Sequence, residues 1–168
     1  MYKRQVYASD VNGDGITELP RAVLMAGYKD TSSSDAVYML DWYAYGIGKV
    51  PAKVATTYQN ISDAWSLLID QKWHDRITAI KANDGGLSYV EFFEYRKNKM
   101  SIPLFNIYCA TGSNREYYAE RTDLIQLGQT TQAIYFAKLT NEGEQSELAL
   151  TGDEIKARFS LVNQAWNN

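Results

Sequence analysis

Apolar and aromatic residues fall in short runs along most of the chain, and polar or glycine-rich segments separate these runs. Runs of this length that are rich in Val, Ile, Tyr and Phe are typical of β-strands. The segment 83–86 (Asn-Asp-Gly-Gly) favours a tight hairpin turn, and a second hairpin is expected around Gly128. The strands predicted in this way cover residues 36–46, 49–60, 76–84, 87–97, 101–111, 123–129 and 130–139.

Three further segments give less regular patterns. Residues 19–28 and 64–73 fit either a strand or a short helix, because periodicity does not separate the two in short apolar runs. Residues 113–122 favour a short helix, with Ser113 as its N-cap.

The C-terminal segment has the period of a helix. Thr151 and Glu154 have the spacing of a capping box, in which each side chain bonds to the backbone of the other residue. One helical face would then carry the apolar residues Ile155, Phe159, Val162 and Trp166. The predicted fold is therefore α+β, an antiparallel sheet of about six to seven strands with a C-terminal helix packed on it.

Composition excludes several classes of protein. The chain has 168 residues and a formal net charge of -3, so it lacks the basic surface that nucleic-acid binding requires. It has no apolar run of transmembrane length, and we expect that residues 1–10 are not a signal peptide, because they contain no apolar segment. We expect it to be part of a longer protein. Its single cysteine, Cys109, lies in an apolar run and is expected to be a buried, inert thiol.

One short motif points to chemistry. Asp10, Asn12 and Asp14 alternate, Gly15 follows, and Glu18 comes four residues after Asp14. Calcium takes six to eight oxygen ligands, and a loop supplies them by alternating ligand and non-ligand positions around a glycine that permits a sharp turn. The predicted ligands are Asp10, Asn12, Asp14, the carbonyl of Ile16 and Glu18, with the Ile16 side chain anchoring the loop to the core. The alternative is an Asx-turn cluster without metal.

The motif departs from an EF-hand in its second half. Position 12, where an EF-hand has a bidentate Glu, is Arg21, and Pro20 disfavours a helix after the loop. The pattern D-x-N-x-D-G-x-x-E instead resembles the short calcium loops of dockerins, integrin-type FG-GAP repeats and VCBS repeats. This resemblance covers about ten residues and implies a structural calcium ion in a bacterial surface protein.

No catalytic constellation is predicted. His74 beside Asp75 is expected to be a solvated turn residue, and no motif supports a His74–Cys109 pair. Four glutamates are scattered and form no recognisable glycosidase pair: Glu91, Glu94, Glu116 and Glu120. Two aromatic pairs, which are Trp42–Tyr43 and Tyr117–Tyr118, are expected to belong to the core rather than to a carbohydrate-binding surface.

A second resemblance covers the chain from about residue 58. The order of polar turn, strand and Trp-ended segment is similar to the opening of PsbP-like domains, with Trp65, Trp73 and Ile77 as the matching apolar positions. It implies an antiparallel sheet with helices, and it carries no active site.

The sequence thus predicts a non-catalytic, calcium-stabilised domain of a secreted or cell-surface bacterial protein, a binding or structural module. It does not identify the partner, for which a glycan and a surface protein are the two candidates. Its expected parts are a calcium-loop segment (1–28) and an α+β domain (36–168) in one compact unit. Two alternatives stay open. One is a surface glycan or peptide hydrolase with structural calcium, and the other is a carbohydrate- or protein-binding module that uses an aromatic face.

Overall fold

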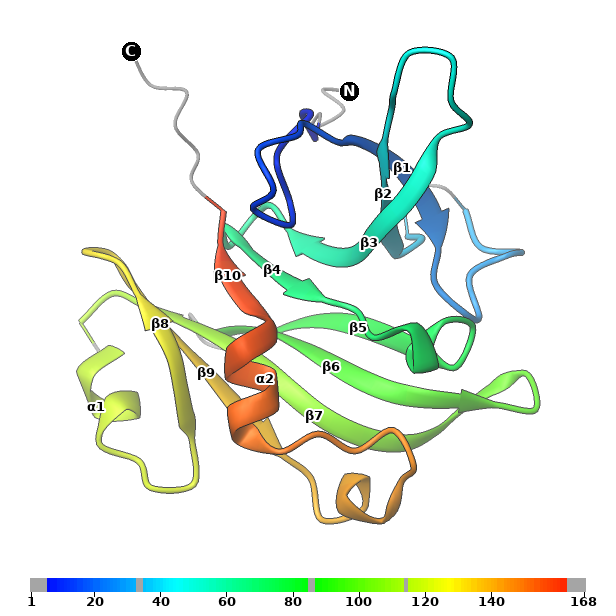
Figure 1. Cartoon of the computed structure of the whole chain (residues 1–168). Helices are drawn as coiled ribbons and strands as arrows, with labels where there is room; N and C mark the ends of the chain where they lie inside the picture. The colour runs from blue at the N-terminus through cyan, green and yellow to red at the C-terminus, as the bar shows by residue number, and fades with distance from the viewer. Residues whose placement is uncertain (1–5, 33–34, 85–86, 114, 163–168) are drawn as a thin grey trace.

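The computed structural model describes residues 6–32, 35–84, 87–113 and 115–162. Within these residues the protein is mostly β, with two antiparallel sheets of five strands each (Figure 1). The first sheet has the order β1-β2-β3-β4-β10 and the second the order β5-β6-β7-β9-β8. The first four strands follow one another as a meander, and β10 returns from the C-terminal region to pair with β4.

The strands of the first sheet are β1 (Leu19–Leu24), β2 (Tyr38–Ala44), β3 (Ala52–Asn60), β4 (Trp65–Leu68) and β10 (Phe159–Leu161). Those of the second sheet are β5 (Ile77–Asp84), β6 (Leu87–Arg96), β7 (Lys99–Thr111), β8 (Ile125–Gln129) and β9 (Ala133–Leu139). The helical elements are η1 (Gln71–Trp73), α1 (Arg115–Ala119), η2 (Gly143–Gln145) and α2 (Gly152–Arg158).

The core lies where the inner faces of the two sheets meet. Tyr58 of β3 packs edge-on against Phe92 of β6, with ring centroids 5.3 Å apart, and Phe92 stacks on Phe105 of β7 at 4.8 Å. Large rings contribute most of the area removed from water in such an interface. Trp65 and Trp73, which the PsbP-like resemblance singles out, are both buried in this core.

The predicted single sheet with a C-terminal helix is wrong. Most of the predicted strands exist, but they belong to two sheets, because the chain leaves the first sheet after β4 and begins the second at β5. Asp70 caps η1 between them by accepting from the backbone of Lys72 at 3.0 Å. The hydrogen bonds of each hairpin form between neighbouring strands. The sequence pattern of a strand therefore does not show whether the next strand continues the same sheet or begins a new one.

The C-terminal helix is shorter than predicted. The capping box of Thr151 and Glu154 is confirmed, and Ile155 is fully buried. The helix ends at Arg158, however, and Phe159 begins β10, where its ring stacks on Trp65 at 5.9 Å. Phe159 and Val162 therefore do not extend a helical face, and Trp166 lies outside the described residues. Helix α2 contacts strands of both sheets, β4 and β8 among them.

Candidate metal site

A closed loop precedes the first strand. Ser9 and Glu18 form an antiparallel bridge, with N–O distances of 3.1 and 2.9 Å, and β1 begins at the next residue. Between them, Gly13 and Gly15 have φ angles of +75° and +84°, a conformation that glycine adopts without steric cost. The expectation that Pro20 disfavours a helix after the loop is confirmed, because strand β1 follows directly.

The side chains predicted as ligands organise the loop from inside. Asp10 accepts hydrogen bonds from the backbone N–H groups of Gly13, Asp14 and Gly15 at 2.7, 3.1 and 2.9 Å. Asn12 Oδ1 accepts from the Asp14 amide at 3.1 Å, and Asn12 Nδ2 donates to Asp14 Oδ2 at 2.9 Å. These bonds form the Asx-turn cluster weighed above, and they fix the side chains toward the loop centre.

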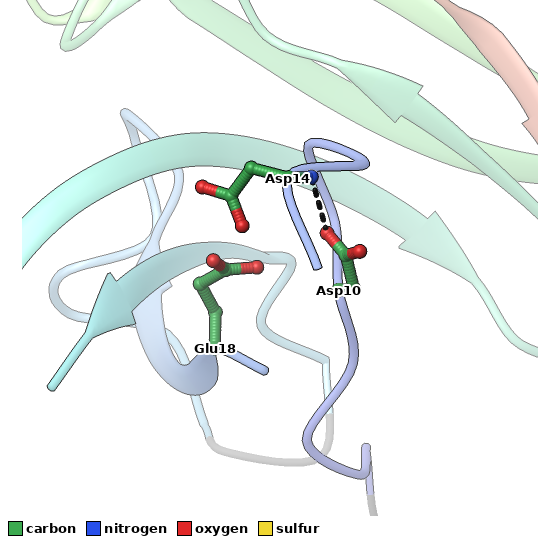
Figure 2. A group of neighbouring side chains, drawn as sticks. All are labelled: Asp10, Asp14 and Glu18. Carbon is green, nitrogen blue, oxygen red and sulfur yellow. Dashed lines mark hydrogen bonds between the residues drawn. The ribbon is translucent and has the colours of Figure 1, made fainter. Parts of the chain in front are cut away.

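Glu18 completes the site from the strand side. It is fully buried, and its Oε2 accepts from the Val11 amide at 2.9 Å, whereas its Oε1 has no hydrogen-bond partner. Oxygen atoms of Asp10, Asp14 and Glu18 lie within 4.8 Å of one another. Figure 2 shows the Asp14 and Glu18 carboxylates turned toward each other and Asp10 bonded to the Asp14 amide.

One predicted detail of the loop turns out differently, and another is confirmed. The Ile16 side chain is 50% exposed, so it does not anchor the loop to the core. The anchor is instead the buried Glu18 and the bridge to Ser9. Arg21, at the EF-hand position 12, lies in β1 opposite Asp41 of β2. Regular strand pairing there confirms that the loop has no EF-hand second half.

The histidine and the cysteine considered for catalysis lie in different environments. His74 lies at the protein surface, 3.2 Å from Asp75, whereas Cys109 is buried in the core. Burial raises the pKa of the Cys109 thiol to about 11, so the thiolate that a nucleophile needs is strongly disfavoured. The prediction of a buried thiol is confirmed, and the structure does not bring His74 and Cys109 together.

The four glutamates considered as a glycosidase pair lie in different environments. Glu94 is fully buried, accepts hydrogen bonds from Arg96 and Arg76, and accepts a third from Ser146 at 2.6 Å. Burial opposes its ionisation, but these donors outweigh burial and lower the pKa of Glu94. Glu91 is on the opposite face of β6, because side chains alternate along a strand. The exposed Glu116 and Glu120 lie in and just after α1.

The two aromatic pairs have different environments. Trp42 is buried, as expected, and its indole N–H donates to Thr57 at 2.8 Å, while Tyr43 is half-buried. Tyr117, expected in the core, is 65% exposed, because α1 is a surface helix with no buried residue. Tyr118 is half-buried and lines a cavity on the outer face of the second sheet.

Comparison of the chain with family models, curated proteins and solved structures finds no match. Among the described residues, no helix is long and apolar enough to cross a membrane. The geometry of the loop from Asp10 to Glu18 is therefore the basis for the function proposed below.

Proposed function

We propose that the loop from Asp10 to Glu18 binds a calcium ion, and that the chain is a non-catalytic, calcium-stabilised domain of a secreted or cell-surface bacterial protein. The observation that carries the proposal is the orphaned Glu18 Oε1, a buried carboxylate oxygen beside two further carboxylates. A buried polar atom left without a hydrogen bond costs about 1–3 kcal/mol, more on a charged group, and a bound cation removes that cost.

The hydrogen bonds within the loop leave room for a metal. An ionised carboxylate has about four acceptor sites on its two oxygens. Asp14 accepts one bond from Ile16 and one from Asn12, and Glu18 accepts one from Val11. Each of these two carboxylates therefore keeps lone pairs for a cation, and the Asx-turn bonds hold the ligands in place without competing for all of them.

The charge of the site also favours a cation. Three carboxylates gather here, and none of the ion pairs among the described residues involves them. Calcium suits this donor set because it prefers oxygen ligands, tolerates irregular geometry and completes its shell with carbonyls and water. The predicted Asn12 amide and Ile16 carbonyl would supply the neutral ligands.

The consequence of binding is structural. The bridge between Ser9 and Glu18 closes the loop directly before β1, and β1 pairs with β2 throughout its length. An ion that binds only the folded loop stabilises the edge of the first sheet by mass action. At 100 times the dissociation constant the gain is about 2.7 kcal/mol. At about 2–4 °C per kcal/mol for this chain length, the melting temperature would rise by roughly 5–11 °C.

The test compares thermal unfolding in EDTA and in calcium for wild type and Glu18→Gln. The substitution keeps the size of the side chain and removes one negative charge from the cluster. It is expected to weaken calcium binding at least tenfold, measured by calorimetric titration. In EDTA it should melt at or above wild type, since repulsion falls, and in calcium it should melt below wild type.

The matched control is Asp30→Asn, a similar neutralisation at an exposed turn outside the loop. It should follow wild type in both conditions. A wild-type melt that is indifferent to EDTA and calcium, with no heat of binding, would leave the Asx-turn cluster as the whole explanation of the motif. A dissociation constant near 10⁻⁴–10⁻³ M would support an extracellular location, because sites of that affinity fill only outside the cell.

A further inference from the structure

The outer face of the second sheet carries a row of aromatic rings. Tyr89 of β6 pairs in register with Tyr108 of β7, which in turn pairs with Phe136 of β9. The Tyr89 and Tyr108 rings lie 5.3 Å apart with a tilt of 35°. The three side chains point away from the core between the sheets, because their strand neighbours Val90, Ile107 and others belong to that core. All three line the cavity, but Phe136 is buried, so the rings of Tyr89 and Tyr108 form its accessible floor.

A polar row borders the rings. Two residues further along each strand, Glu91, Asn106 and Lys138 pair across the same three strands. Asn106 Nδ2 donates to the Tyr108 hydroxyl at 3.0 Å, so the two rows are joined. An aromatic surface thus lies beside a carboxylate, an amide and an ammonium group.

The segment that includes α1 builds a wall over this floor. Tyr118, Arg121 and Leu124 line the cavity, which has a volume of about 230 Å³. Arg121 binds Asp123 with both Nε and Nη2, at 2.9 and 2.7 Å, and Lys138 lies 3.1 Å from the same carboxylate. This network fixes the wall to β9 and neutralises one of the two cations.

We propose that this cavity binds a single neutral, hydroxylated ring, the chemistry of a monosaccharide unit in a glycan. Ring faces offer an apolar platform, and the tyrosine hydroxyls and the charged groups of Asp84, Arg121 and Lys138 offer hydrogen bonds at its edge. Of the charged groups that line the cavity, Asp84 is negative, and Arg121 and Lys138 are positive. Asp123 pairs with both cations, so these four charges balance, while Glu91 in the bordering row does not line the cavity. A balanced site favours neither an anion nor a cation.

The size of the cavity restricts the ligand further. Pockets for drug-sized molecules have volumes of roughly 300–1,000 Å³. The cavity here, at about 230 Å³, is smaller and is open on one side. It therefore suits one ring of a longer chain whose other units stay in solvent.

The test is binding of the intact protein to an array of immobilised neutral, sialylated and sulfated glycans, followed by calorimetric titration with the best soluble monosaccharide. Neutral glycans should bind. Tyr89→Ala and Tyr118→Ala should each lower the affinity about tenfold or more, since each removes one ring surface. Tyr45→Ala is the control, because Tyr45 is 57% exposed and does not line the cavity, whereas Tyr117 packs edge-on against Tyr118.

Tyr118→Ala keeps the test valid if Tyr89→Ala misfolds, because α1 is a five-residue surface helix without buried residues. Glu18→Gln should leave glycan binding unchanged, which separates this site from the calcium loop. The proposal is overturned if no neutral glycan binds above background, if only charged glycans bind, or if the two tyrosine variants bind as tightly as Tyr45→Ala.

Discussion

The buried carboxylate of Glu94 gives the sharpest prediction about stability. Its Oε1 faces Arg96 and Arg76, and its Oε2 accepts from Ser146, which also caps the Leu148 amide at 3.0 Å. Glu94 therefore joins β6 to the segment that leads into α2. Glu94→Gln keeps the volume of the side chain but removes its charge. The new amide NH₂ group also faces one of the groups that donate hydrogen bonds to Glu94, so that hydrogen bond is lost.

The magnitude follows from burial and exposure. Removing one partner from a buried ion pair typically costs about 3–5 kcal/mol. Here Arg76 and Arg96 are 42% and 46% exposed and regain water after the change, so the expected cost is about 2–3 kcal/mol. At about 2–4 °C per kcal/mol, the melting temperature should fall by roughly 4–12 °C.

The pH dependence has a definite sign. The pKa of Glu94 is lowered in the folded protein, so its contribution to stability is complete above the ordinary value of 4.5 and is lost as pH falls through the folded pKa. Urea unfolding, followed by tryptophan fluorescence, should show a gap between wild type and Glu94→Gln at pH 7 that closes in acid. Glu91→Gln, on the opposite face of β6, is the control and should stay within about 0.5 kcal/mol. A Glu94→Gln protein as stable as wild type at pH 7, or a gap independent of pH, would refute this reasoning.

Two further outcomes are expected. Gly143→Ala should destabilise the protein by about 1–3 kcal/mol, because a Cβ there would lie 2.5 Å from the backbone oxygen of Leu104. Gly152→Ala should cost much less, since its Cβ would meet only side-chain atoms of Ile125, which can move. Equal losses of stability in thermal melts would contradict this prediction. Cys109 should not react with a thiol reagent at pH 8 in the native protein, because it is 3% exposed and burial raises its pKa to about 11. It should react fully in guanidinium, and rapid labelling of the native protein would show that the core opens there.

Local interactions are what the sequence alone determined. The capping box of Thr151 and Glu154 and the glycine-bearing loop from Asp10 to Glu18 depend on residues a few positions apart, so their spacing is enough to predict them. Most strands could be predicted for the same reason. That Glu18 is buried, and that one of its oxygens lacks a partner, could not be predicted, because this depends on how the loop packs.

The pairing of distant strands was decided only by the tertiary structure. The chain leaves its first sheet after β4, and β10 returns over 90 residues later to pair with β4, through contacts that no local pattern encodes. The aromatic row has a similar origin. A regular hairpin counted from the Arg96–Lys99 pair would place Asn106 opposite Tyr89, but two bulges in β7 move Tyr108 into that position. Side-chain alternation is a property of the sequence, whereas register is a property of the packed sheets.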